Sequence, residues 1–178
     1  MRKFSKKNIK IGVLGGTFDP PHIGHLHISK IALKKLKLNK LLWIVVKKNP
    51  LKGKPYFNAK KRIEFSRRIT KNEKKIFVKY MDDKIKSSKT FDLINHIKKK
   101  NKKIKLYFLM GADNLVKFHK WNNWRKIPKL AKIVVFARQN YTTKSLNSIA
   151  SKKLNKKDWT YIDSKKVNIS SSLIRKFW

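Results

Sequence analysis

The chain has 178 residues, of which 40% are hydrophobic, and it carries a formal net charge of +39. This length and apolar content suit one folded domain with a buried core and exclude an intrinsically disordered chain. Cysteine is absent, which excludes disulfides and thiolate metal sites, and no apolar segment is long enough to cross a membrane. The apolar run at residues 9–14 is also short for a signal peptide. We therefore predict a single cytoplasmic domain over residues 1–178.

The positive charge comes from 41 lysines and 7 arginines that are spread along the whole sequence. Such a charge would suit a nucleic-acid-binding protein, but the basic and aromatic residues form no RNA-binding signature. An excess of Lys and Asn is also what a genome rich in A and T encodes. We favour this codon bias, and expect no specific nucleic-acid partner and no membrane partner. In either case the field attracts anionic substrates.

In the first half of the chain, apolar runs alternate with segments of helical spacing. The predicted order is a strand at residues 9–14, a helix at 23–36, a strand at 40–46, a loop at 47–55 and a helix at 59–70. The second strand is apolar throughout, which is typical of a central strand of a parallel sheet. Prolines and a glycine exclude regular structure from the loop, and Asn58 is predicted to cap the helix that follows.

The second half continues the alternation of strands and helices. The predicted order is a strand at residues 76–80, a polar loop at 82–89, a helix from Ser88 or Thr90 to Ile97, a strand at 104–110, helices from Asp113 and over 121–127, a strand at 133–137, a strand at 159–162 and a helix from Ser170 to Trp178. Pro128 is expected to end the helix before it. The polar residues 141–157 indicate either a loop or a weak helix around 145–154.

This alternation predicts the α/β class, a Rossmann-like doubly wound parallel sheet with helices on both faces and right-handed crossovers. Ligands in such folds bind at the carboxyl ends of the strands, where the strand order reverses. The polar motifs of this chain follow the first, the fourth and the last predicted strands. We therefore expect them to meet in one crevice.

The most informative stretch is residues 15–25, which read Gly-Gly-Thr-Phe-Asp-Pro-Pro-His-Ile-Gly-His between the first strand and the first helix. Gly15 and Gly16 carry no Cβ, so that a phosphate can come close to the backbone. The helix start offers unpaired N–H groups and a partial positive charge. His22 and His25 lie three residues apart, so both rings can face one point. These features together indicate a phosphate-binding turn.

This stretch resembles the signature of the nucleotidyltransferase superfamily with the His-x-Gly-His motif, and in particular that of bacterial nicotinate-nucleotide adenylyltransferases. Residues 169–175, Ile-Ser-Ser-Ser-Leu-Ile-Arg, resemble the Ile-Ser-Ser-Thr-x-x-Arg motif of that family, with Ser172 in place of Thr. Residues 111–115, Gly-Ala-Asp-Asn-Leu, followed by Trp121 and Trp124, also fit the family. Class I aminoacyl-tRNA synthetases share the histidine motif, but the chain lacks their Lys-Met-Ser-Lys-Ser-like loop and a tRNA-binding domain.

The resemblance implies that the protein transfers the adenylyl group of ATP to nicotinate mononucleotide, giving deamido-NAD and pyrophosphate. It places His22 and His25 on the ATP phosphates as the catalytic pair, acting as hydrogen-bond donors in a largely neutral form. The further ATP-binding residues that it implies are Gly15, Gly16, Thr17, Phe18, Gly111, Asp113, Ile169, Ser171, Ser172 and Arg175. Among these, Asp113 would hydrogen-bond the adenosine ribose, and Ser171, Ser172 and Arg175 would hold pyrophosphate.

For the acceptor, the resemblance implies Lys52, Thr90, Trp121 and Arg138, with Trp121 stacking on the pyridine ring and Trp124 in the core. The segment 89–94 lacks the tyrosine and the second threonine that are usual in the family. Nicotinamide mononucleotide and phosphopantetheine therefore remain alternative acceptors, and an inactive basic nucleic-acid-binding module remains an alternative outside enzymology.

No His or carboxylate cluster has metal-ligand spacing, so we expect no resident metal. Mg²⁺ is expected to arrive with ATP, held chiefly by phosphates and water, with Asp19 as the one carboxylate near enough to touch a hydrated cation. The sequence does not indicate an oligomeric state.

Overall fold

The structure is a computed structural model that describes residues 9–49, 51, 53–164 and 167–178. The described residues form a six-stranded parallel sheet in the order β3-β2-β1-β4-β5-β6. The strands are β1 (Lys10–Gly16), β2 (Lys40–Val45), β3 (Ile76–Tyr80), β4 (Lys105–Gly111), β5 (Lys132–Phe136) and β6 (Trp159–Ile162). The order reverses between β1 and β4, so the predicted Rossmann-like fold is confirmed, and the crevice expected for a ligand lies between these two strands.

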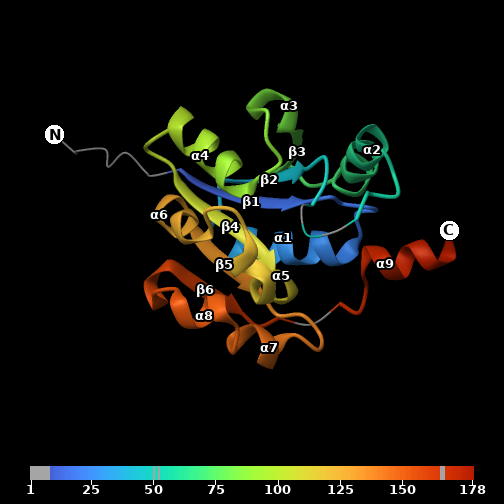
Figure 1. Ribbon diagram of the computed structural model, residues 1–178. Helices are drawn as coiled ribbons and strands as arrows, with labels where there is room; N and C mark the ends of the chain where they lie inside the picture. Colours follow the sequence, from blue (N-terminus) through green and yellow to red (C-terminus); the bar gives the residue numbers. More distant parts are fainter. Residues whose placement is uncertain (1–8, 50, 52, 165–166) are drawn as a thin grey trace.

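Helices surround the sheet in Figure 1. They are α1 (Ile23–Lys35), α2 (Ala59–Ile69), α3 (Asp82–Ile85), α4 (Thr90–Lys100), α5 (Ala112–Lys117), α6 (Ile127–Leu130), α7 (Thr142–Leu146), α8 (Ile149–Lys153) and α9 (Ser171–Ile174). Short 3-10 turns are η1 (Phe118–Lys120), η2 (Trp124–Lys126), η3 (Lys156–Asp158) and η4 (Arg175–Phe177). None of the helices in the described ranges is long and apolar enough to span a membrane.

Two apolar cores lie on opposite faces of the sheet, because successive strand residues point to opposite sides. In β4, Phe108 and Met110 belong to the core formed with α4, α5, α6 and α8. Tyr107 and Leu109 belong to the core under α1 and α2. Burial on both faces explains why the strands at the centre of the sheet read as continuous apolar runs.

Four local predictions were wrong. The helix expected over residues 121–127 is not continuous: residues 124–126 form η2, and α6 begins at Ile127. Residues 82–85 form α3, where the sequence suggested only a polar loop. Pro128 does not end a helix: it lies in the first turn of α6, where a proline is tolerated because the backbone N–H there has no intrahelical partner. Gly15 and Gly16 are the last residues of β1 and not part of the turn, since they pair with Ile44 and Val45 of β2.

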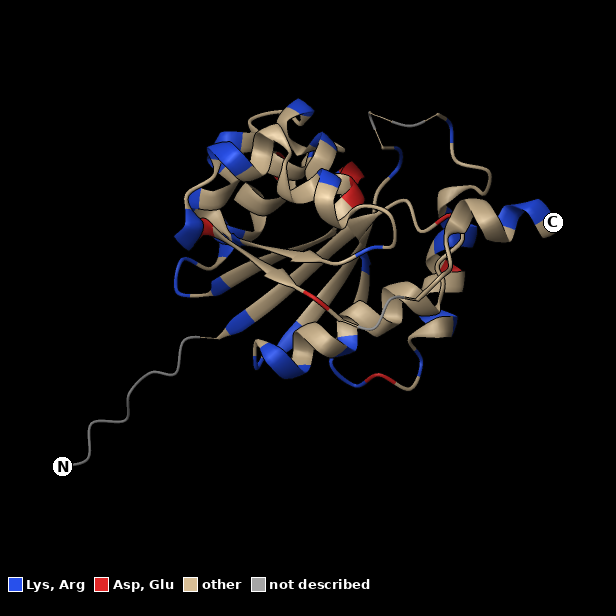
Figure 2. Cartoon of the chain, turned by 90° about the horizontal axis from the view of Figure 1, so that it is seen from below, with Lys and Arg blue, Asp and Glu red and all other residues tan. Residues whose placement is uncertain are grey.

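Figure 2 shows lysine and arginine distributed over helices and loops throughout the chain. Strands β1, β2, β4 and β5 each begin with a lysine, so these lysines lie at the amino ends of the strands, away from the crevice at the carboxyl ends. The charge is therefore a property of the whole surface and is not confined to the ligand-binding edge.

Candidate functional site

A cavity of about 810 Å³ opens at the carboxyl ends of β1 and β4, where the strand order reverses. Every predicted site residue that the structure describes lines this cavity. These residues are Gly15, Gly16, Thr17, Phe18, His22, His25, Thr90, Gly111, Asp113, Trp121, Arg138, Ile169, Ser171, Ser172 and Arg175. Lys52 lies outside the described residues. Segments up to 160 residues apart thus meet at one edge of the sheet, as the order of the motifs predicts.

The turn between β1 and α1 is held in an unusual backbone shape. Phe18 has a positive φ of 49°, which a bulky side chain rarely adopts. Its ring is 2% exposed and stacks on Trp43 with 4.8 Å between centroids. Burial of the ring against β2 therefore stabilises the strained turn.

The two motif histidines face each other at the start of α1. Their ring centroids lie 3.8 Å apart, and Nδ1 of His25 accepts a hydrogen bond of 3.2 Å from the main-chain N–H of His22. A Cβ at Gly24 would come within 2.9 Å of the His22 ring and 3.2 Å of Ile169, so glycine allows this close packing. The expectation that both rings face one point is met.

His22 is neutral over the physiological pH range. Burial, and secondarily the positive charge of Arg138, lowers the pKa of its imidazole from 6.5 to about 4. Its Nδ1 is buried and makes no full hydrogen bond among the described residues, although the His22 side chain faces the main-chain N–H of His25 in a capping box. A neutral ring whose buried nitrogen makes no full hydrogen bond is suited to hydrogen bonding with a ligand.

Two residues that the sequence did not indicate support His25 from behind. The Trp43 indole Nε1 donates to Ser29 Oγ at 2.8 Å, and Ser29 Oγ donates to the His25 carbonyl at 2.7 Å. Both side chains are fully buried. They read as ordinary strand and helix residues in the sequence, and only their pairing across β2 and α1 gives them this role.

Asp19, the one carboxylate expected near a hydrated cation, already has both of its oxygens in hydrogen bonds. The side chain is buried, and its two oxygens accept hydrogen bonds from the main-chain N–H groups of Tyr56 and Phe57 at 2.8 and 2.9 Å. Asp19 thus ties the turn to the loop before α2. Within the described ranges, no three His, Asp or Glu side chains come together as a metal site would require.

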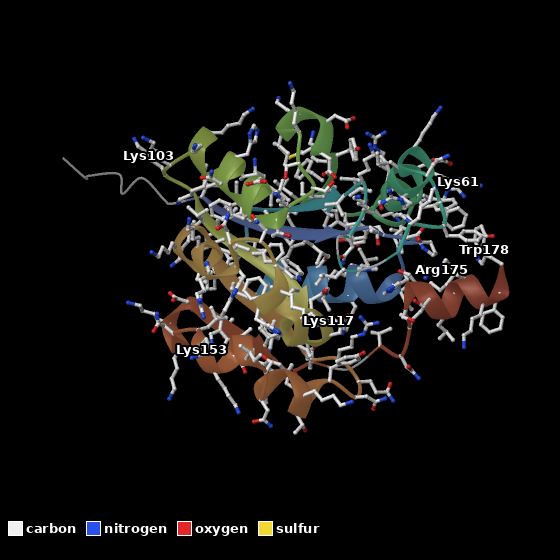
Figure 3. The ribbon with its side chains drawn as sticks, in the orientation of Figure 1. Lys61, Lys103, Lys117, Lys153, Arg175 and Trp178 are labelled. Atoms are coloured by element: carbon white, nitrogen blue, oxygen red, sulfur yellow. The ribbon has the colours of Figure 1, made fainter. Side chains whose placement is uncertain are left out.

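The C-terminal arm, residues 169–178, packs against this turn. Ser170 caps α9 by accepting from Leu173 N–H, while Ser171 Oγ donates to the Pro20 carbonyl at 2.8 Å. The guanidinium of Arg175 donates to the Asp19 carbonyl oxygen and lies 3.5 Å from the Asp19 carboxylate. Figure 3 shows Arg175 beside the start of α1, and Trp178 toward α2, where its ring contacts Phe57 at 5.1 Å.

Asp113 and Arg138 form an ion pair between the ends of β4 and β5. Arg138 Nη1 donates to Asp113 Oδ2 at 2.8 Å. The other carboxylate oxygen, Oδ1, is buried with no hydrogen-bond partner in the described part of the chain. A Cβ at Gly111 would lie 2.5 Å from this oxygen, so glycine makes room for it. Asp113 therefore presents one open acceptor at the edge of the sheet.

The opposite wall of the cavity is formed by Thr90, at the first turn of α4, and by Trp121. The Trp121 ring is partly buried and packs edge-on against Phe118 and Phe108, at 5.3 and 6.0 Å between centroids. It both lines the cavity and contacts the core. Trp124 packs on the same core, as expected.

Arg62 is a further residue that the sequence analysis missed. It is 2% exposed on α2 and hydrogen-bonds Thr17 of the turn. One signal could have found it: arginine occurs only seven times in a chain with 41 lysines, and Arg62 shares the inner helix face with Ser66, one turn on.

The Cytidylyltransferase-like family model matches residues 13–177. A protein of Pelagibacter ubique named probable nicotinate-nucleotide adenylyltransferase is 48% identical over 172 residues, covering 97% of this chain and 95% of that protein. A protein of a Ruegeria species with the same name is 38% identical over 128 residues, covering 72% of this chain and 67% of that protein.

Among solved structures, nicotinic acid mononucleotide adenylyltransferase of Plasmodium falciparum, complexed with NaAD, superposes with a TM-score of 0.72. The two sequences are 21% identical, and the superposition covers 96% of this chain and 84% of the Plasmodium chain. At this identity the likeness shows a shared fold.

Proposed function

The chain belongs to the nicotinate-nucleotide adenylyltransferases, within the Cytidylyltransferase-like family, and from this membership we propose how it transfers the adenylyl group of ATP to nicotinate mononucleotide. A phosphate oxygen of the mononucleotide forms a bond to the α-phosphorus of ATP. The bond from that phosphorus to the bridging oxygen breaks, and pyrophosphate leaves with the electron pair. The products are deamido-NAD and pyrophosphate. The protein positions the two reactants and stabilises developing charge.

The observation that carries the proposal is the convergence of three motif segments on one cavity at the strand-order reversal. We call residues 15–25 and 169–175 the donor half of this cavity, and residues 87–90 and 120–122 the acceptor half. ATP phosphates bind the donor half, where the start of α1 provides N–H groups and a partial positive charge. His22 and His25 donate hydrogen bonds to the phosphate oxygens, and the neutral state of His22 suits donation without proton transfer.

The C-terminal arm closes the donor half over the departing pyrophosphate. Arg175 already holds the arm to the turn through Asp19, and its nitrogens form a charged edge next to Ser172 Oγ, at 3.2 Å. Ser172 adds a hydroxyl donor at the start of α9, while the Ser171 hydroxyl donates to the Pro20 carbonyl and holds the arm to the turn. Arg175 therefore both positions the arm and contributes positive charge to the phosphates.

The adenosine ribose binds at the end of β4. Support for this comes from Asp113, whose Oδ1 is a buried acceptor with no partner among the described residues, while Arg138 fixes its other oxygen. A ribose hydroxyl would satisfy that oxygen. Arg138 pairs with Asp113 and its charge also acts on His22, so it favours a phosphate of either substrate.

The pyridine ring of the mononucleotide binds in the acceptor half against Trp121, and Thr90 donates to the acceptor. The flat ring of a pyridine nucleotide suits an aromatic wall better than the flexible chain of phosphopantetheine. Mg²⁺ enters as part of the ATP complex, held by phosphate oxygens and water. Both carboxylate oxygens of Asp19 already accept main-chain hydrogen bonds, which supports a metal ion that arrives with ATP and is not held by this side chain. The cytoplasmic location stays a prediction.

The test is pyrophosphate release with ATP and Mg²⁺, run separately with nicotinate mononucleotide, nicotinamide mononucleotide and phosphopantetheine, with the dinucleotide product identified by mass spectrometry. We expect the highest kcat/KM with nicotinate mononucleotide. Preference for another acceptor would overturn the substrate while keeping the chemistry. Folded protein that turns over none of them, but binds random DNA in a steeply salt-dependent way, would favour the nucleic-acid alternative.

A further inference from the structure

Arg62 on α2 is a buried cation that the proposed reaction does not use. Its side chain is 2% exposed, whereas Lys60, Lys61, Arg67 and Arg68 on the same helix are exposed. The ion pairs of the described residues do not include it. Burial lowers the pKa of Arg62, and the negative charges of Asp19 and Asp82 oppose that effect. A charge buried in this way destabilises a protein unless hydrogen bonds compensate for it.

The compensation comes from main-chain carbonyls of three separate segments. Arg62 Nε donates to Phe57 O at 3.0 Å, just before α2. Nη1 donates to Thr17 O at 2.6 Å, in the turn after β1, and to Val46 O at 2.8 Å, after β2. Nη2 donates to Lys47 O at 3.0 Å. A planar guanidinium with five fixed N–H donors can span such a set, and a lysine ammonium cannot.

Asp82 extends the same network toward the acceptor half. Its Oδ2 accepts from Lys47 N–H at 2.7 Å and from Ser88 Oγ at 2.5 Å. Lys47 is therefore held at its carbonyl by Arg62 and at its N–H by Asp82. Through this residue, the contacts of Arg62 link the phosphate-binding turn to the wall that carries Ser88 and Thr90.

We propose that Arg62 is a positioning residue for adenylyl transfer, which fixes the turn at Thr17 relative to the end of β2 and thereby aligns the donor half with the acceptor half. This inference rests on the proposed function. An in-line displacement depends on the relative placement of two bound reactants, and a misplacement of about 1 Å can cost about 100-fold in rate. Arg62 touches neither reactant in this role; it acts through the main chain of the turn.

The experiment compares Arg62→Lys and Arg62→Gln with Arg67→Lys and Arg67→Gln, the same changes at an exposed position of the same helix. We expect both Arg62 variants to lower kcat by about 10- to 100-fold, with a smaller rise in KM for either substrate. The Arg67 variants should stay within about two-fold of the unchanged protein. Arg62→Gln buries no charge, so it gives a second folded variant if Arg62→Lys does not fold.

Measurement of kcat at several temperatures separates a positioning role of Arg62 from a role in stability alone. If Arg62 positions the turn, the ratio of variant to wild-type kcat stays low on cooling, while circular dichroism shows the variants fully folded. A ratio that returns to one on cooling would overturn the proposal, as would a folded Arg62 variant within about two-fold of wild-type kcat. The wild-type assay run alongside keeps the two questions apart, because an inactive wild type would contradict the proposed function itself.

Discussion

The donor half and the acceptor half of the cavity are held together in different ways. In the donor half, hydrogen bonds join segments far apart in the chain: Ser171 to Pro20 across 151 positions, Arg175 to Asp19 across 156, and Arg62 to Thr17 across 45. Next to the acceptor half, the side-chain bonds of Ser88 to Asp82 and of Ser87 to Asp92 span six and five positions, while the bond from Lys47 N–H to Asp82 spans 35. The donor half therefore depends more strongly on long-range hydrogen bonds than the acceptor half does.

This difference matches where the sequence departs from the family pattern. The altered segment 89–94 lies at the acceptor half, where a local change disturbs few distant contacts. Residues of the donor half follow the family motifs closely. We expect substitutions in the donor half to impair the reaction as a whole, and those in the acceptor half to affect the mononucleotide alone.

The largest effect is expected for His25→Ala. Loss of one hydrogen-bond donor to charge that develops in the transition state should lower kcat by about 100-fold or more. Steady-state pyrophosphate release with both substrates saturating measures it. His96→Ala, on α4 and away from the cavity, is the matched control and should keep wild-type kcat. Near-normal turnover by His25→Ala would contradict the catalytic role proposed for the donor half.

Arg175→Lys should have the next largest effect. An ammonium group keeps the charge but cannot bond the Asp19 carbonyl and Ser172 Oγ together in the planar geometry of arginine. We expect KM for ATP to rise by about 10-fold, with kcat also reduced. Lys176→Ala, at the exposed neighbouring position, should change neither. Equal kinetics for the two variants would show that the arm is not held through Arg175.

Trp121→Ala tests whether the acceptor half affects binding of the mononucleotide alone. Loss of a stacking surface should raise KM for the mononucleotide by about 10-fold and leave KM for ATP unchanged. Trp124→Ala removes a ring of the same size from the same core, and should lower the melting temperature without changing either KM. If Trp121→Ala raises both KM values equally, the ring supports the core and not the substrate.

The smallest effect concerns the protonation of His22. An NMR titration of the ligand-free protein should place its midpoint at about 4, below the ordinary 6.5, because burial and then Arg138 disfavour the charged ring. Below pH 6.5 the unfolded chain therefore binds a proton that the folded chain does not, so stability should fall as the pH drops from 6.5 toward 4. His22→Gln should lose this part of the acid sensitivity. A midpoint near 6.5 would contradict the burial of the ring.

The sequence predicted what depends on local pattern and failed where distant groups meet. The first strand, the helix from Ile23 and the convergence of the motifs follow from apolar runs and from the geometry of parallel sheets. The partners of Asp19 are main-chain groups 37 and 38 positions away, and those of Arg62 are main-chain groups 5 to 45 positions away, for which the sequence carries no signature. Pro128 was misplaced because proline is compatible with either the end or the first turn of a helix.

The proposed reaction depends on one cavity that holds both reactants, and a crystal structure of the protein with deamido-NAD tests this most directly. We expect the bridging phosphates within hydrogen-bond distance of His22 and His25, the adenosine ribose on Asp113 Oδ1, and the pyridine ring against Trp121. A dinucleotide whose phosphates lie away from both histidines, or whose pyridine ring lies outside the acceptor half, would contradict the division of the cavity described above.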